Sequence, residues 1–362
     1  MYCKRLILKD FRSYPSLDVS FPEGPIFLTG PNGSGKTNII EGIHYLSLAR
    51  SFRKAPDRSL IRKGQKEASI YLEYHDEKDD LDHTISAVIR DKGKLFAVDD
   101  EEVEKISSIL GKLIAVHYEP SQVFFFKEEP LIRRKLLDET LSQLSPEYFY
   151  SISRYKKLIK ERNAALSQNG DIDIINAYRD QLINVSYRIV YERKKLIRSI
   201  NKRVNELYKV LFYEDKEFSL LYKTNCPIDD DQKSFVQHSV KLFESNKSME
   251  KLRQTTLIGP HRDDLSGMLD KNNIADYGSQ GENRVASLTL RLSLAEAMKE
   301  RLGHAPILLL DDITSDLDQK RCDRLLEFIQ GTGQSFLTGT KVPESAKGYA
   351  VYETDSQQLR RN

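Results

Sequence analysis

The stretch Gly30-Pro31-Asn32-Gly33-Ser34-Gly35-Lys36-Thr37 decides the fold of this chain. It fits the pattern G-x-x-x-x-G-K-[ST], in which glycines allow successive backbone N–H groups to point at a polyphosphate. The lysine of such a loop reaches the outer phosphates, and the threonine hydroxyl ligates Mg²⁺. The apolar run 26–29 predicts a buried strand before the loop, and Ile39, Ile43 and Leu46 have helical spacing after it. We therefore expect strand, loop and helix in direct succession, with a nucleoside triphosphate as the ligand.

A second stretch, Pro306-Ile307-Leu308-Leu309-Leu310-Asp311-Asp312, has four aliphatic residues followed by two carboxylates. This is the form of a buried parallel strand that ends at a Mg²⁺ site. We expect Asp311 to hold the metal and Asp312 to orient or deprotonate the attacking water. A strand that ends in acids is weak evidence alone, but it is strong evidence in a chain with a phosphate loop upstream.

A third stretch lies shortly before the acidic strand, at residues 277–284. Ser279 and Gly281 precede a run with helical periodicity, so they predict an anion-binding helix N-terminus. Taken alone, the same residues are equally typical of a simple capped helix. The order of phosphate loop, serine-glycine segment and double aspartate is that of the ABC-type ATPases. In that class the serine-glycine segment of one protomer faces the γ-phosphate bound by the other, so hydrolysis needs a dimer and Lys36, Ser279, Gly281 and Asp312 are the candidate catalytic residues.

The totals are those of an ordinary globular chain with room for two lobes: 362 residues, 39% hydrophobic and 30% charged. The run 307–310 is too short to cross a bilayer, and the first residues lack the apolar stretch of a signal peptide. Three widely spaced cysteines without a C-x-x-C motif predict reduced thiols. We expect a cytoplasmic protein.

Basic residues concentrate in the middle of the chain. Residues 130–212 are helical in pattern, with the longest candidate helix at 177–212, and residues 151–212 hold 14 Lys and Arg against 6 Asp and Glu. That segment is thus +8 in a chain of +2, so the rest sums to −6. A solvated helix face and a phosphate-backbone footprint both fit, and the size of the excess favours DNA contact. The candidate contacts are Lys156, Lys157, Lys160, Arg193, Lys194, Lys195 and Arg198.

The remaining segments complete the predicted architecture. Residues 68–98 predict an antiparallel meander, the acidic run 99–104 a solvated helix start, and residues 229–252 another helix. We expect an α/β fold: a discontinuous ATPase head with an antiparallel β-subdomain at 1–118 and 253–362, and a mainly helical arm at 119–252.

At this point the chain resembles the RecF family, which is related to the SMC ATPases. The resemblance runs nearly end to end through blocks at 11–14, 30–38, 133–138, 160–163, 259–265, 279–281 and 310–312. Gly259-Pro260-His261-Arg262-Asp263-Asp264-Leu265 and the double-aspartate strand are more diagnostic than the phosphate loop, which many folds share.

The resemblance implies an ABC-type, SMC-like head that binds ATP and Mg²⁺. It further implies an ATP-dependent homodimer that binds duplex DNA and single-strand/duplex junctions, and that works with RecO and RecR to load recombinase at gaps. The family usually has glutamine at 282 and often at 283, where this chain has Glu282 and Asn283. A carboxylate near an incoming γ-phosphate is unfavourable, so trans engagement is weakened unless Glu282 points away.

Some assignments stay open on the sequence alone. Arg12 is either a solvated loop arginine or a second cation for the bound phosphates, and we include it among the candidate ATP-binding residues. Gln65 is only a guess for the metal-linked loop, and His261 and Arg262 are either structural or face DNA, with a structural role favoured.

The main hypothesis is a slow, DNA-stimulated ATPase that clamps DNA in gap repair and replication restart. The alternatives are the nucleotide-binding subunit of an ABC transporter, another SMC-like chromosome-maintenance ATPase, an ABC-headed nuclease, and a nucleotide-locked protein without turnover. Transporter subunits lack a long basic helical insert between the phosphate loop and the serine-glycine segment, and no appended nuclease region is visible.

Overall fold

The computed structural model describes residues 1–53, 55–168, 170–212, 215–226, 231–313, 317–355 and 358–361. The chain forms two compact units, each with its own core. Unit 1 comprises Met1–Val123, Leu207–Glu214 and Ser287–Asn362, and unit 2 comprises Phe124–Glu206 and Asp215–Ala286.

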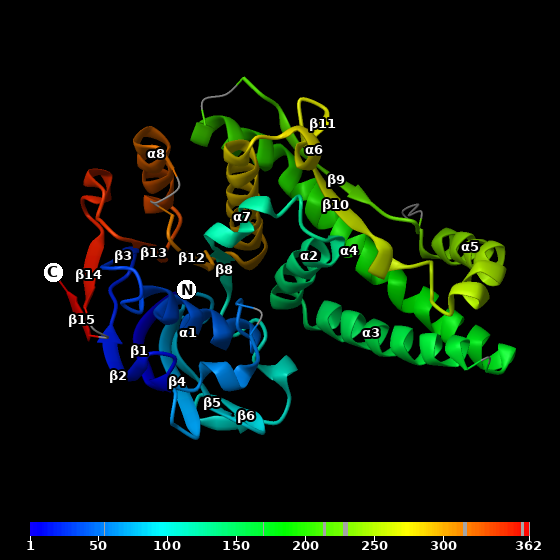
Figure 1. Ribbon diagram of the computed structural model, residues 1–362, viewed down its shortest axis with the longest axis horizontal. Helices are drawn as coiled ribbons and strands as arrows, with labels where there is room; N and C mark the ends of the chain where they lie inside the picture. The colour runs from blue at the N-terminus through cyan, green and yellow to red at the C-terminus, as the bar shows by residue number, and fades with distance from the viewer. Residues whose placement is uncertain are drawn as a thin grey trace. The chain divides into compact units, whose positions relative to one another are not determined.

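Unit 1 contains a six-stranded sheet in which every neighbouring pair is antiparallel, in the order β2-β1-β4-β5-β6-β7 (Figure 1). Its strands are rich in apolar residues that alternate with polar ones, as expected of a sheet with one buried face. The bounds are β1 Tyr2–Phe11, β2 Tyr14–Ser20, β4 Glu67–Asp76, β5 Leu81–Arg90, β6 Gly93–Val98 and β7 Glu101–Val103.

The second sheet of unit 1 has the order β15-β14-β3-β13-β12-β8 and is parallel except for the edge pair β14–β15. Strands β3, β13 and β12 are almost completely buried, as expected of parallel strands that are covered on both faces. Because β3, β13 and β12 run parallel, the loops that follow β3 and β12 leave the same edge of the sheet, which is where ligands bind in open α/β sheets. The bounds are β3 Pro25–Thr29, β8 Ala115–Tyr118, β12 Ile307–Leu310, β13 Ser335–Gly339, β14 Ala350–Asp355 and β15 Gln358–Arg361.

Helix α1 (Lys36–Leu48) lies between the two sheets of unit 1, because it contacts β1, β4 and β5 on one side and β13 and β8 on the other. Eleven of its 13 residues are buried. Helix α8 (Gln319–Gln330) is amphipathic, and the Asp318 side chain caps it by accepting a hydrogen bond from the Arg321 N–H. Short 3₁₀ turns in unit 1 span Asp57–Leu60, Ile106–Ser108 and Glu344–Ala346, and a fourth, Pro120–Phe124, ends at the first residue of unit 2.

Unit 2 is mainly helical. Helix α3 begins where Ser145 accepts a hydrogen bond from the Tyr148 N–H and Pro146 occupies the first helical position. The helix α4 is 41 residues long, roughly 60 Å at 1.5 Å per residue, and its last residues belong to unit 1. The helices are α2 Pro130–Leu144, α3 Pro146–Ser167, α4 Ile172–Phe212, α5 Gln232–Arg253, the short α6 Ile274–Tyr277 and α7 Gln280–Leu302, which continues into unit 1.

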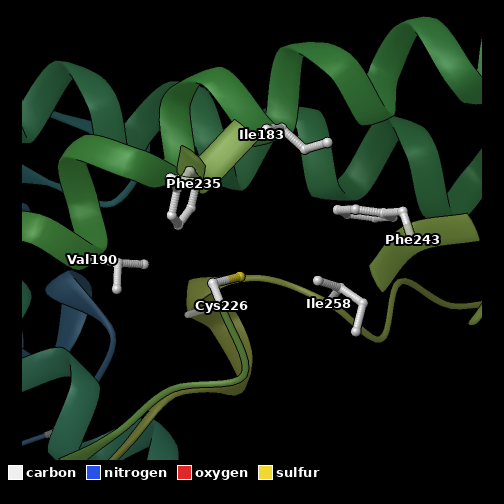
Figure 2. Close-up of a cluster of buried hydrophobic side chains, with 6 residues drawn as sticks. All are labelled: Ile183, Val190, Cys226, Phe235, Phe243 and Ile258. Carbon is white, nitrogen blue, oxygen red and sulfur yellow. The ribbon is translucent and has the colours of Figure 1, made fainter. Parts of the chain in front are cut away.

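A small antiparallel sheet of order β11-β10-β9 lies in unit 2, with β9 Phe218–Lys223, β10 Asp264–Leu269 and β11 Asn272–Asn273. Apolar side chains of α4, α5 and the segments beside this sheet form a buried cluster of Ile183, Val190, Cys226, Phe235, Phe243 and Ile258. Figure 2 shows these side chains pointing toward one another. The cluster holds α5 against α4, so the arm is a packed unit and not an isolated helix.

The predicted α/β class, antiparallel subdomain and helical second part are confirmed. Packing differs from the expected boundaries at residues 253–286, which group with unit 2, because β10 pairs with β9. The predicted helix start at 99–104 is wrong, since these residues form a turn and strand β7. None of the helices in the described part of the chain is long and apolar enough to span a bilayer.

Candidate functional site

The loop between β3 and α1 has the conformation of a phosphate cradle. Gly30 has φ 143°, and a Cβ there would lie 2.3 Å from the Thr354 carbonyl oxygen. Gly35 has φ 109°, and a Cβ there would lie 2.6 Å from the Tyr14 hydroxyl. Both positions therefore require glycine for conformation and for space. The Ser34 hydroxyl lies 2.5 Å from that of Thr354 and fastens the loop to β14.

The backbone donors of this loop are available to a ligand. Among the described residues, the N–H groups of Gly33, Gly35, Lys36 and Thr37 donate to no backbone carbonyl oxygen, and no side chain caps α1. Pro31, Asn32 and Gly33 are exposed at the tip of the loop. Unpaired N–H groups at the N-terminus of a largely buried helix fit an anionic ligand, because the helix dipole adds to them.

Lys36 bends back over the loop. Its ammonium donates to the carbonyl oxygens of Gly30 at 2.6 Å and Pro31 at 2.8 Å. Burial lowers the pKa of Lys36, and the nearby carboxylates of Asp312 and Asp311 oppose that shift. A cation held among carbonyls and facing two carboxylates is placed to exchange those contacts for phosphate oxygens.

Asp311 joins the phosphate loop to the acidic strand. Its Oδ1 accepts hydrogen bonds from the hydroxyls of Thr37 at 2.9 Å and Thr338 at 2.7 Å. Burial raises the pKa of Asp311, although these two hydrogen bonds favour the charged form. The structure thus brings together Thr37 and Asp311, the two residues that the sequence predicts as metal ligands.

Asp312 follows with φ 46°, in the left-handed region that aspartate tolerates better than most residues. Its backbone N–H donates to the Thr338 hydroxyl at 2.7 Å. Thr338 therefore holds both aspartates, one through its backbone and the other through its carboxylate.

Arg12, a candidate ATP-binding residue, forms hydrogen bonds with residues outside the phosphate loop. Its Nη2 and Nε donate to Glu41 at 2.6 and 2.9 Å, and its Nη1 donates to the Ser59 carbonyl oxygen at 2.9 Å. Glu41 is completely buried on α1. Arg12 therefore neutralises a buried carboxylate in this structure, and its contact with a nucleotide stays a prediction.

Ser279 and Gly281 begin helix α7 in unit 2. The Ser279 N–H donates to Glu282 Oε2 at 2.7 Å, and the Glu282 N–H donates to Ser279 Oγ at 3.2 Å, which is a capping box. Lys216 pairs with the other oxygen of Glu282 and, as the largest cause, lowers the pKa of that carboxyl. Asn283 is fully buried, and its amide donates to the carbonyl oxygens of Gly278 and Ser279.

The Glu282 side chain thus folds back onto the start of its own helix, and Lys216 neutralises its charge. The unfavourable charge expected from the sequence is compensated within unit 2, and Asn283 fastens the backbone of the serine-glycine segment. Ser279 itself is exposed.

The candidate DNA contacts separate into two groups. Lys156, Lys157 and Lys160 on α3, and Lys195 and Arg198 on α4, are exposed, and Lys194 is half-buried. Arg193 is only 1% exposed and pairs with Asp138 at 2.8 Å and Asp263 at 3.2 Å. Because this guanidinium is enclosed by its partners, the prediction that Arg193 contacts DNA is wrong, and the residue is structural.

Sequence reasoning missed Glu119 and Gln122, which follow β8. Asp311 donates its N–H to the Tyr118 carbonyl oxygen at 2.9 Å, so Glu119 emerges beside the acidic strand. Burial raises the pKa of Glu119, and Asp311 adds to the shift. Gln122 accepts from Arg291 at 2.9 Å, whereas the guessed Gln65 lies exposed before β4.

Comparisons with known proteins agree with this geometry. The family model of the RecF/RecN/SMC N-terminal domain matches residues 2–358. The DNA replication and repair protein RecF of Halalkalibacterium halodurans is 33% identical over the whole of both chains, and that of Clostridium tetani is 34% identical over 96% of this chain and 95% of its own.

Among solved structures, one titled as the recombination mediator protein RecF with ATP in the RecFOR pathway has a TM-score of 0.91 at 24% identity, with 100% of this chain and 97% of that chain covered. An Smc head domain from Pyrococcus furiosus has a TM-score of 0.59 at 15% identity, over 100% and 96% of the two chains. At these identities the likeness establishes an SMC-type ATPase fold.

Proposed function

The chain belongs to the RecF family of DNA replication and repair ATPases, and from that premise we propose that ATP bound at residues 30–37 joins two copies of it on DNA. The observation that carries the proposal is the hydrogen bond from Thr37 to Asp311, which connects a loop of unpaired N–H groups to the acidic strand. A structural glycine turn has no need of either feature. Together they form a phosphate site with its metal-side carboxylate in place.

The residues fit both ATP and Mg²⁺. Lys36 and the free N–H groups of the loop would hold the β and γ phosphates, as in other phosphate loops. The described residues contain no group of three or more His, Cys, Asp and Glu side chains that could hold a metal alone. Mg²⁺ fits such a site, because it takes one or two protein oxygens, here those of Thr37 and Asp311, and completes its shell with phosphates and water. When bound, it would neutralise charge on the transferred phosphoryl group.

Slow hydrolysis follows from the residue that would act on water. Asp312 would orient or deprotonate the attacking water, and its side chain is one methylene shorter than a glutamate. Its half-buried position beside Lys36 supports this role. We infer that turnover is low for the chain alone and rises when DNA favours the joined state.

We propose that two copies of the chain act together on DNA. Ser279 and Gly281 of one copy would face the γ-phosphate held by Lys36 of the other, so ATP would join two heads. The exposed basic residues of α3 and α4 would then contact the phosphate backbone of duplex or junction DNA. Work with RecO and RecR to load recombinase at gaps is part of the same proposal. Three free, buried cysteines are compatible with the reducing cytoplasm, where we place it.

The transporter-subunit alternative is not favoured, because full-length relatives carry the RecF name and the basic helical arm is present. The test is ATP hydrolysis by the full chain with and without gapped DNA. We expect a slow basal rate that gapped DNA raises and that Lys36→Ala abolishes. A fast rate that ignores both DNA and protein concentration would contradict the proposal.

A further inference from the structure

The corner that begins helix α7 contains a charge pair that neither capping nor packing requires. We define the signature corner as residues 277–282 together with Lys216. Both carboxylate oxygens of Glu282 are used: Oε2 accepts the Ser279 N–H at 2.7 Å, and Oε1 pairs with the Lys216 ammonium. A glutamine could make the first bond equally well, because capping boxes accept either residue. The carboxylate is therefore needed only for Lys216.

Lys216 is held firmly at this corner. The backbone N–H of the next residue, Glu217, donates to Asp270 Oδ1 at 2.8 Å, and the Asp270 N–H donates to the Glu217 carbonyl oxygen at 2.9 Å. Strand β9 starts one residue later and pairs with β10 over its whole length. The ammonium is thus delivered by an anchored strand end, and its side chain is still 41% exposed.

The electrostatic consequence concerns the approaching triphosphate. A lone carboxylate three residues after Ser279 would repel a polyphosphate and cancel the positive end of the helix dipole. With Lys216 the pair sums to zero. Loss of the lysine alone would leave a net negative charge beside Ser279.

Tyr277 provides a second feature of the same corner. Tyr277 is 79% exposed and directly precedes the Gly278-Ser279 segment. Gly278 leaves no room for a side chain, since a Cβ there would lie 2.6 Å from the Ile274 carbonyl oxygen, so the backbone that presents Tyr277 is tightly packed. Tyrosine is among the residues that contribute most to interface energies when covered.

We propose that the signature corner docks on a second copy of this chain, with Lys216 facing the triphosphate held there and Tyr277 covered by that copy. The inference rests on the proposed function and adds two residues to it, Lys216 and Tyr277.

The test measures the dissociation constant of the ATP-dependent dimer by sedimentation velocity of the full chain with Mg²⁺ and a non-hydrolysable ATP analogue. Lys216→Ala should weaken the dimer about tenfold, and Glu282→Gln should tighten it about tenfold, as expected for charges at an interface. The double variant should return to within about threefold of the wild type, because it removes both charges. Tyr277→Ala should weaken the dimer, and Tyr277→Phe should restore it.

Matched controls are available in the same unit. Lys241→Ala on α5 removes another exposed lysine, and Tyr150→Ala on α3 removes another exposed tyrosine; neither should change the dimer. Thermal melts of each variant check that the fold is intact. If the wild type forms the dimer and Lys216→Ala keeps its affinity, or Glu282→Gln weakens it, the inference is overturned and the proposed function stands. If the wild type stays monomeric with the analogue, both are overturned.

Discussion

At the scale of the residue, the threonine hydroxyls around Asp311 determine how the site works. Thr37 and Thr338 both donate to this buried carboxylate, and Thr338 also accepts from the backbone of Asp312. One phosphate-loop residue and one residue of β13 thus fix the acidic strand. A substitution at Asp311 can separate its role in hydrolysis from its role in the stability of unit 1. An amide in its place can accept the same hydrogen bonds without a buried charge.

The first prediction separates these two roles. Asp311→Asn should lower ATP hydrolysis by at least about 100-fold, because the metal-side charge is lost. The melting temperature should stay equal or rise, since burial disfavours the charged carboxylate. Steady-state hydrolysis and thermal melting measure the two effects, with the exposed Asp100→Asn as control. Retained hydrolysis would refute the assignment of Asp311.

The second prediction concerns the buried Arg193. Arg193→Met should destabilise the protein by about 3 to 5 kcal/mol, because Asp138 and Asp263 are left as buried carboxylates without their main partner. Urea unfolding followed by circular dichroism measures this cost. The exposed Arg198→Met should change stability little and serves as the control. An Arg193→Met protein of normal stability would show that the buried network is not needed for the fold.

The third prediction concerns His261, which accepts from the Tyr155 hydroxyl through Nδ1 at 2.6 Å and donates from Nε2 to the Thr256 carbonyl oxygen at 3.0 Å. Burial lowers the pKa of His261 to about 4. The unfolded chain binds this proton near pH 6.5, so the stabilisation is complete above that pH and is lost as pH falls toward 4.

Comparison of the wild type with His261→Gln gives the measurement. Between pH 6.5 and 4 the wild type should lose up to about 3 kcal/mol more stability than the variant. Parallel urea titrations at each pH provide the values. Equal pH dependence of the two proteins would show that His261 is not held neutral by the fold.

At the scale of the element, helices α3 and α4 carry the proposed DNA-binding surface. Their apolar positions pack against α2 and α5, and many of their lysines and arginines are exposed. A binding surface built from such charges depends on phosphates and not on base sequence.

The fourth prediction follows from that surface. Reversal of Lys194, Lys195 and Arg198 to glutamate should weaken DNA binding and reduce the slope of log affinity against log salt by about 0.9 for each lost contact. Fluorescence anisotropy with gapped duplexes over a salt series measures both. The control reverses Lys241, Lys247 and Lys251 on α5, with the same change of net charge. An unchanged slope in the α4 variant would remove this helix from the footprint.

Helices and strands with a strong apolar periodicity were predicted correctly from the sequence, whereas a turn was not. The loop, α1, β12 and the long α4 were predictable, because glycine spacing and apolar period decide them locally. The run at 99–104 was misread as a helix start. Asp99 and Asp100 both have positive φ and form a two-residue turn between Val98 and Glu101, a conformation for which Asn-Gly is the usual signal.

Contacts between residues far apart in the chain explain the remaining differences between the predictions and the structure. Nothing in the residues themselves indicates that 218–223 pairs with 264–269, yet that pairing draws residues 253–286 into unit 2. The burial of Arg193 was hidden for the same reason, because its carboxylate partners lie 55 and 70 residues away in the chain. The motifs were enough to predict the candidate site itself. Glu119 was found only because β8 pairs with the acidic strand β12.

At the scale of the whole molecule, each proposed ATP site is composite and is made by two copies of the chain. Lys36 belongs to unit 1 and Ser279 to unit 2, and each would complete a site on the other copy. A variant that lacks Lys36 still offers an intact Ser279, and a variant that lacks Ser279 still offers an intact Lys36. A mixture of the two can therefore build one complete site, whereas neither variant alone can build any.

Sedimentation velocity of Lys36→Ala and Ser279→Arg, separately and mixed, with ATP and gapped DNA, is the most direct measurement. We predict monomers with weak DNA binding for each variant alone, and a mixed dimer with restored binding when the two are combined. Dimers formed by either variant alone, or a mixture that stays monomeric, would contradict the claim that ATP is trapped between two copies of this chain.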